Sequence, residues 1–276
     1  MRHIITLSFL AFLLGSCGSS NKYSLVKGAK ADAPDANLRI NDSIYIDYLE
    51  ISFLAYSEYQ FYLDRIYGLD SKQSKFAALD TTVISQLRAF AQSSESEYGE
   101  TIDVETLPVV GITYEQAQAY TKWRTAVVLE NSLVEAGLLY PYKEQDEKSH
   151  FTPEVYFSGK FTGYKPANME FLVFRLPTEE EWDVIYSKAM DTTQTLNTIA
   201  PTYEDKSQAV QFINDNVSEM IATKGVAKGG NWLDGGKEHI YEGSEVWLGF
   251  RCVADLMSSE DYMKRYAPSK KRGYSR

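Results

Sequence analysis

Cysteine and histidine are scarce in this chain, which contains two cysteines and three histidines among 276 residues. No clustered Cys/His pattern of a zinc site is present, and neither is a Ser/His/Asp arrangement at motif spacing or a phosphate-binding glycine loop. Once an N-terminal export signal is removed, Cys252 is the one cysteine left inside the mature domain, so an internal disulfide is excluded. An exported domain without disulfides needs a substantial hydrophobic core.

The N-terminal apolar run, residues 4–14, is shorter than the about 20 residues of a membrane-spanning helix. It follows a basic start and precedes small residues, which is typical of an export signal. The sequence Leu-Gly-Ser-Cys at 14–17 resembles the lipobox of bacterial lipoproteins. That resemblance implies cleavage before Cys17 and lipid attachment to it, and several acyl chains together anchor a protein stably. The alternative is an ordinary secretory signal with a chance cysteine.

The charge of the chain is uneven, with a net value of −10 at pH 7. Removal of the signal, which contains Arg2, changes the net charge to −11. Residues 264–276 contain six basic residues and no acids, so the rest of the mature chain has a net charge of −17. A strongly acidic body argues against nucleic acid as a partner. The basic end is interpreted either as a solvated terminus or as a contact for an acidic partner or anionic head groups.

Composition divides the chain into four segments. Residues 1–16 form the signal peptide, and 17–42, rich in small and polar residues, form a flexible tether. Residues 43–256 form the domain, which is large enough for a core of its own. Residues 257–276 form a basic C-terminal tail.

Apolar spacing predicts a strand at 43–48, a helix through 55–66 that ends at Gly68, and a helical stretch near 83–91. Thr113 with Gln116, and Thr178 with Glu181, each fit a capping box at the start of a helix. From residue 214 onward, glycines and short apolar pieces predict irregular, turn-rich β structure.

Six blocks occur in an order that resembles the formylglycine-generating, or sulfatase-modifying factor, domain family. In the second, third and last, the chain reads PVVGIT, RLPTEEEW and GFRC. The fourth block departs from the family at Ser218 and Met220, where tryptophans usually stand. The blocks are residues 43–47 with 50–51, 108–113 with 117–123, 175–182, 215–219, 228–232 and 249–252.

The resemblance implies an α+β fold of the C-type-lectin-like kind, with few helices, small antiparallel sheets and much ordered loop. We expect Arg175 and Arg251 to bind buried carbonyls or carboxylates, and the tryptophans of the blocks to fill the core. The fold-defining residues are predicted to be Trp123, Arg175, Glu181, Trp182, Asn216, Glu219, Gly229, Gly230, Trp232, Gly249, Phe250 and Arg251.

The family's oxidases bind copper through two cysteines between the fifth and sixth blocks, a pair that suits Cu(I). In this chain the interval 233–248 contains no cysteine, and Cys252 matches a family cysteine outside the copper pair. We therefore predict no catalytic residue for cysteine-to-formylglycine conversion. A related branch uses iron held by three histidines, whereas the mature chain has only His150 and His239. A mixed site with carboxylates stays open as an alternative.

The family's second calcium site implies one candidate metal site. Main-chain oxygens of Asp215 and Val217 and the side chain of Glu219 match its ligands, while Phe212 replaces an expected asparagine. Calcium takes six to eight oxygens, so a ligand is missing. The alternative is that Glu219 and Asn216 tie loops together by hydrogen bonds. No cofactor is required on either reading.

An insertion at about 129–173 resembles the gliding-motility lipoproteins GldJ and GldK of Bacteroidota, although this chain is shorter than the larger members. The resemblance implies an outer-membrane lipoprotein whose partners are the membrane and proteins of the gliding or type IX secretion machinery. Residues 18–22 carry no acids, which favours the periplasmic face.

Three functions follow as hypotheses. The first is a non-catalytic structural or interaction protein of an envelope assembly. The second is a divergent metal-dependent oxidase that uses carboxylates and His239. The third is a module that binds glycans or peptides on its aromatic surface.

Overall fold

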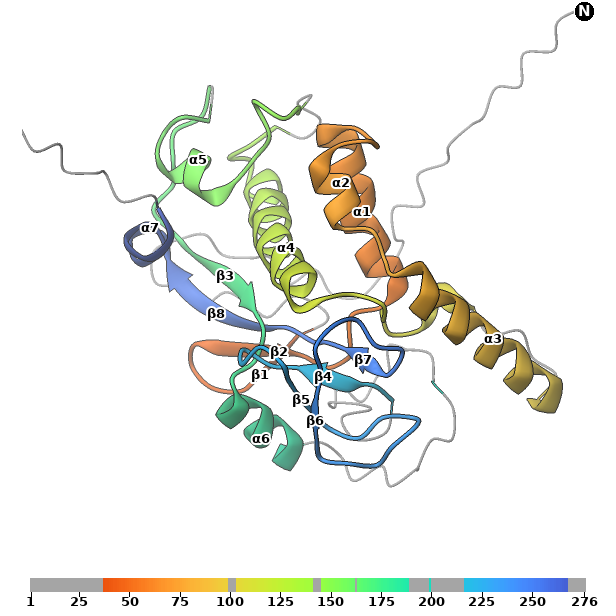
Figure 1. Cartoon of the computed structure of the whole chain (residues 1–276). Coiled ribbons are helices and arrows are strands. Elements are labelled where there is room, and N and C mark those ends of the chain that lie inside the picture. Colours follow the sequence, from red (N-terminus) through yellow and green to blue (C-terminus); the bar gives the residue numbers. More distant parts are fainter. Residues whose placement is uncertain are drawn as a thin grey trace, which may run out of the picture.

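The computed structural model describes residues 37–98, 103–140, 145–161, 163–188, 199 and 216–267. Within these ranges two small four-stranded sheets are surrounded by helices and long loops (Figure 1). The α+β, C-type-lectin-like fold class predicted from the sequence is confirmed. The elements are β1 (Asn37–Arg39), β2 (Ile44–Asp47), α1 (Phe53–Tyr67), α2 (Lys72–Phe76), α3 (Thr81–Tyr98), η1 (Val104–Thr106), α4 (Tyr114–Glu135), α5 (Pro153–Phe157), β3 (Glu170–Arg175), α6 (Glu179–Lys188), β4 (Ser218–Met220), β5 (Val226–Lys228), β6 (Glu238–Ile240), β7 (Leu248–Gly249), β8 (Val253–Ser258) and α7 (Ser259–Tyr266).

The first sheet joins the two ends of the domain. Its strand order is β1-β2-β8-β3, and all of its pairs are antiparallel. The second sheet has the order β6-β5-β4-β7, with a parallel β4–β7 pair, and contains the predicted irregular β structure as far as it is described. The first and last blocks of the sequence lie side by side, because the amides of Asp47 and Ile51 donate to the main-chain oxygens of Cys252 and Phe250, each at 3.0 Å.

Helix ends follow the predicted capping chemistry. Thr113 Oγ1 accepts the amide of Gln116 while Oε1 of Gln116 accepts the amide of Thr113, so the box at the start of α4 is confirmed. Thr178 and Glu181 exchange the same two bonds at the start of α6. Helix α1 ends at Gly68, as predicted, because its φ of 90° suits glycine.

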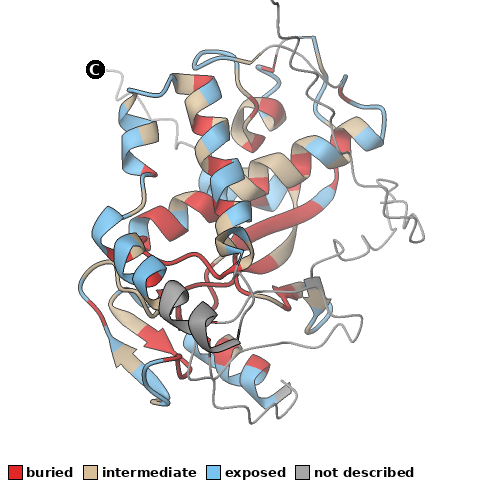
Figure 2. Cartoon of the chain, turned by 90° about the vertical axis from the view of Figure 1, so that its right-hand side faces the viewer, coloured by how far each residue is buried: buried red, intermediate tan, exposed pale blue. Residues whose placement is uncertain are grey.

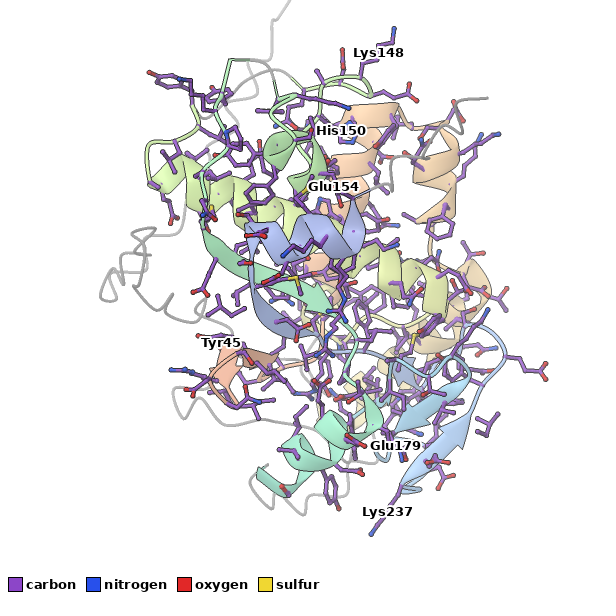
Figure 3. All side chains as sticks on the ribbon, turned by 90° about the vertical axis from the view of Figure 1, so that its left-hand side faces the viewer. Tyr45, Lys148, His150, Glu154, Glu179 and Lys237 are labelled. Carbon is purple, nitrogen blue, oxygen red and sulfur yellow. The ribbon has the colours of Figure 1, made fainter. Side chains whose placement is uncertain are left out.

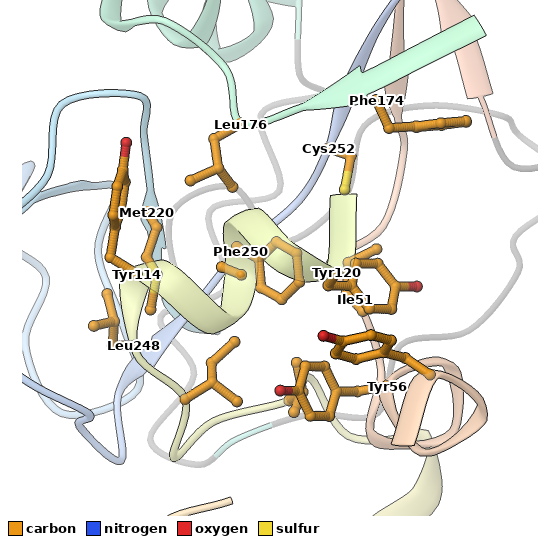
Figure 4. Packing of buried hydrophobic residues seen from close by; sticks show 14 of the residues in the cluster. Ile51, Tyr56, Tyr114, Tyr120, Phe174, Leu176, Met220, Leu248, Phe250 and Cys252 are labelled. Carbon is orange, nitrogen blue, oxygen red and sulfur yellow. The ribbon is translucent and has the colours of Figure 1, made fainter. Parts of the chain in front are cut away.

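The central core lies between α1, α4 and the two sheets, where buried residues concentrate (Figure 2). Tyr56 stacks on Tyr120 with ring centroids 5.8 Å apart, and Phe250 meets Tyr120 edge to face at 5.4 Å (Figure 4). Aromatic pairs at these distances add to the stability that burial provides. The hydrophobic core expected of a disulfide-free domain is therefore present, and much of it is aromatic.

The predicted insertion builds a second core of its own. The C-terminal half of α4, the segment through α5 and the start of β3 enclose a separate apolar cluster, to which α7 contributes Tyr262. Its buried members are Leu129, Leu133, Leu139, Phe151, Tyr156, Phe161, Met169, Phe171, Val173 and Tyr262.

Two segment boundaries need correction. Strand β1 lies within the predicted tether and pairs with β2, so the folded part begins before residue 43. Strand β8 and helix α7 continue to Tyr266, within the predicted tail of 257–276. The basic composition of that segment masked a helix whose Tyr262 is buried. Residues 268–276, the signal peptide and most of the tether lie outside the described residues.

Tyr262 fastens α7 to the insertion, and its removal is expected to be costly. Its hydroxyl donates to Glu154 Oε1 at 2.6 Å and its ring lies 5.1 Å from that of Phe171. We expect Tyr262→Ser to lower the free energy of unfolding by about 3 kcal/mol, measured by urea denaturation. Tyr266→Ser, at an exposed position on the same helix, should change it by less than about 0.5 kcal/mol. Equal losses in the two variants would contradict this role.

No helix in the described ranges is both long enough and apolar enough to cross a membrane.

Candidate functional site

The GFRC block places a fully buried ion pair at the centre of the molecule. Arg251 comes from the turn before β8, and its Nε and Nη2 donate to the Glu219 carboxylate of β4 at 2.8 and 2.5 Å. Trp182 Nε1 of α6 donates to Glu219 at 3.2 Å. Arg251 Nη1 also donates to the main-chain oxygen of Asp47 at 3.1 Å. Three fold-defining residues that are far apart in sequence are thereby joined, and the expected role of Arg251 is confirmed.

A second pair lies beside the first. Arg124 of α4 forms a two-bonded contact with the Asp47 carboxylate of β2, at 2.5 and 2.8 Å, and stacks over the Phe174 ring at 4.2 Å. Asp47 Oδ2 also accepts the amide of Cys252 at 3.0 Å. Such two-bonded arginine–carboxylate contacts are short and directional. The pair therefore fixes α4 against the first sheet.

Glu50 lies next to this network without a comparable partner. The residue is 3% exposed, and neither carboxylate oxygen makes a hydrogen bond with the described residues. Burial raises the pKa of Glu50 to about 8, and the Glu219 carboxylate adds to the rise, while the Arg251 charge and the Asn216 side chain oppose it. At neutral pH the Glu50 carboxyl is therefore mostly protonated, and the cluster balances two arginines with two carboxylates.

Arg175 serves a third, more exposed contact. Its guanidinium donates to Glu181 at 2.7 Å and to Asp255 at 2.8 Å. Arg175 therefore ties β3 to the first turn of α6 through Glu181 and to β8 through Asp255. This is the carboxylate contact expected for the arginine of the RLPTEEEW block.

The other fold-defining residues are structural as well. Trp182 and Trp232 are buried, whereas Trp123 is half-buried and packs against Tyr59 and Tyr62. Gly249 allows close backbone approach, since a Cβ there would lie 2.7 Å from Val217 Cγ2 and 3.2 Å from a main-chain oxygen. Asn216, Gly230 and Phe250 are buried. Gly229 is also buried and has a φ of 85°, a backbone conformation that favours glycine.

The interval 233–248, which corresponds to the one that holds the copper ligands in the family, contains no cysteine. His239 Nε2 lies 3.3 Å from the oxygen of Gly236, and its ring packs 5.3 Å from Trp247. Cys252 is fully buried, and burial raises the pKa of its thiol well above its usual range. A thiol held in this form is a poor ligand and a poor nucleophile. The residues present do not fit a copper site.

The two histidines do not meet. His150 precedes α5 and bonds the Tyr67 hydroxyl at 3.1 Å, whereas His239 lies in β6 at the other end of the molecule (Figure 1). In the described ranges no three His, Cys, Asp or Glu side chains are placed to hold a metal ion. The divergent-oxidase hypothesis thus has no assembled ligand set in this part of the chain.

The calcium candidates are only partly described. Asp215 and Phe212 lie outside the described residues, and Val217 is buried. Both oxygens of Glu219 point to Arg251, so a cation bound there would compete with a guanidinium. This contact fits the alternative in which Glu219 ties loops together. Calcium binding itself stays a prediction.

The described residues form an aromatic groove at the surface. It has a volume of about 510 Å³ and runs along the outer face of α4, between α1 on one side and β3, the insertion and α7 on the other. Tyr62, Tyr67, Trp123 and Tyr266 line it and retain exposed surface. Figure 3 shows His150 and Glu154, two further lining residues, near α5.

Sequence reasoning missed three features: the Asp47–Arg124 pair, buried Glu50 and the groove. The sequence did contain a signal for the Asp47–Arg124 pair: Arg124 lies on an otherwise apolar face of α4, and a buried arginine requires an acidic partner. The groove had no signal, since its walls come from five separated segments.

Comparison with known proteins supports the fold assignment. A sequence model of the sulfatase-modifying factor enzyme 1-like domain matches residues 15–194. The closing KGGNW and GFRC blocks lie beyond that match. No curated protein matches the chain. The chain is similar to the crystal structure of CarF, with 17% sequence identity and a TM-score of 0.36 over 78% of this chain and 87% of that chain.

Proposed function

The chain belongs to the sulfatase-modifying factor enzyme 1-like domain family, and we propose that it is a lipid-anchored, non-catalytic member that acts as an interaction component of an envelope assembly. The proposal rests on two observations taken together. The ion pairs Arg251–Glu219 and Arg175–Glu181, whose residues belong to the family blocks, are both formed, whereas the interval 233–248 has no cysteine to bind copper.

The chemistry of the remaining groups supports the same conclusion. The one thiol of the mature domain, on Cys252, is buried with a raised pKa, and His239 bonds within its own loop. The family's oxidases hold copper through two cysteines, and such soft thiolate ligands select Cu(I). A domain with an intact fold and without those ligands is suited to binding rather than catalysis.

The insertion and the lipobox give the proposal its setting. Lipid on Cys17 would hold the domain at the outer membrane, facing the periplasm. The insertion at about 129–173 adds an ordered surface with its own core, which a partner protein could contact. Together with the resemblance to GldJ and GldK, these features support a place in gliding motility or type IX secretion.

Crosslinked co-purification from native membranes tests the assembly role. The full chain with a C-terminal tag is compared with Cys17→Ser, which should leave the membrane fraction. Recovery of secretion or gliding components at a fixed ratio, dependent on Cys17, would support the proposal. Recovery of the tagged chain alone from membranes would contradict it.

A further inference from the structure

The groove along α4 is walled by aromatic side chains that retain exposed surface. Partly exposed rings of Tyr62, Tyr67 and Trp123 stand on its α1 side and Tyr266 on its α7 side. The flat, weakly polar faces of sugar rings stack on such side chains, whose polar tips can also hydrogen-bond. A concave site with several aromatic walls and few polar groups is typical of small-molecule recognition.

Charged side chains of both signs line the groove: Lys122, Arg175 and Glu154, whose carboxylate accepts the Tyr262 hydroxyl at 2.6 Å. Lys122 is exposed on the floor and has no ion-pair partner among the described residues. A second depression of about 600 Å³ shares Gln118, Arg175 and Leu176 with the groove, and Arg265 lines it. The guanidinium of Arg265 lies 5.8 Å from the centre of the Tyr266 ring and forms no ion pair with the described residues. Arg175 is already held by two carboxylates, so Lys122 and Arg265 provide the available cations.

The edge of the sheet offers little to an extended peptide. β3 is an edge strand beside the groove, but the amide of Phe174 donates to Thr125 Oγ1 of α4 at 2.8 Å. Peptides that bind by adding a strand depend on such free edge groups. Stacking surfaces with nearby cations and the exposed amide of Gln118 match a sugar with carboxylates better than a peptide.

We propose that the groove between α1, α4 and α7 binds an acidic oligosaccharide, with Tyr266 and the other exposed rings stacking on sugar rings, Lys122 pairing with a carboxylate in the groove and Arg265 pairing with one in the adjoining depression. This site goes beyond the assembly role and does not depend on it. A carboxylated envelope polysaccharide is the corresponding ligand class.

Calorimetric titration of the full chain in detergent tests the proposal. The probes are hexamers of galacturonate, mannuronate and hyaluronan, with cellohexaose as the neutral probe and hexaglutamate as the acidic peptide. At least one acidic hexamer should bind, while cellohexaose and hexaglutamate should bind much more weakly. Lys122→Gln and Tyr266→Ser should each raise the Kd by about five-fold or more.

Matched variants separate the site from general charge effects. Lys237→Gln removes an exposed lysine at the opposite end of the molecule (Figure 3), and Tyr140→Ser removes an exposed tyrosine outside the groove. Both should leave the Kd within about two-fold. The proposal is overturned if no acidic hexamer binds, if cellohexaose or hexaglutamate binds as well, or if Lys237→Gln weakens binding as much as Lys122→Gln. None of these outcomes bears on co-purification of envelope proteins.

Discussion

Replacing Arg251 with methionine is expected to lower the free energy of unfolding by about 3–5 kcal/mol. The Glu219 carboxylate is fully buried and now accepts hydrogen bonds from Arg251 and Trp182. In the variant it would keep its charge and, of these two donors, only the Trp182 indole. A buried carboxylate without its cation is costly because solvation is lost and no counter-charge replaces it. The main-chain oxygen of Asp47 would also lose a donor. Urea denaturation followed by circular dichroism measures the change.

A double variant distinguishes a lost ion pair from lost packing. Arg251→Met combined with Glu219→Leu removes both charges and should recover much of the stability lost in the single variant, because a matched apolar pair can replace a buried ion pair. Lys264→Met, which breaks an exposed pair with Glu260, serves as the surface control and should change the stability far less than Arg251→Met. An Arg251→Met loss as small as that of the control would show that the buried pair does not hold the two sheets together.

Glu50→Gln is expected to stabilise the protein increasingly as pH rises. Burial raises the pKa of Glu50 from 4.5 to about 8 in the folded state, so the folded protein keeps a proton that the unfolded chain releases. Stability from this group is therefore complete below about pH 4.5 and is lost as pH rises towards 8, at about 1.4 kcal/mol per pH unit. Glutamine does not titrate, so the variant should gain about 4 kcal/mol over the parent between about pH 5 and pH 8.

Denaturant unfolding of both proteins across this pH range measures the effect. Arg251, Glu219 and Asn216 face Glu50 and are unchanged in the variant. Glu242→Gln, at an exposed position, should follow the parent at every pH. Parallel stability curves for the parent and Glu50→Gln would mean that Glu50 is ionised in the folded protein, and the charge balance of the cluster would have to be revised.

Local signals in the sequence predicted what depends on local chemistry. Thr113 and Thr178 sit three residues before glutamine and glutamate, and both capping boxes form, because their bonds involve neighbours within one turn. Gly68 ends α1 for a similarly local reason, its positive φ. The pairing of Arg251 with a buried carboxylate was also predictable, since a buried arginine needs an acid.

Features assembled from distant segments could not be predicted in the same way. The partner of Arg124 is Asp47, 77 positions away, and no spacing rule connects them. Helix α7 carries so many charges that its composition resembles a solvated tail, yet Tyr262 on one face buries against the insertion. The raised pKa of Glu50 depends on what surrounds the side chain in space, which a pattern of residue types does not record.

Copper(I) titration of the purified full chain, together with an oxidation assay on a cysteine-containing sulfatase peptide, tests most directly whether the domain keeps the family fold without the family chemistry. Because the interval 233–248 lacks cysteine and Cys252 is buried, we expect no copper bound at one ion per chain and no conversion of the peptide cysteine to formylglycine. Binding of one copper ion per folded chain with formylglycine formation would contradict the non-catalytic assignment and restore an oxidase function.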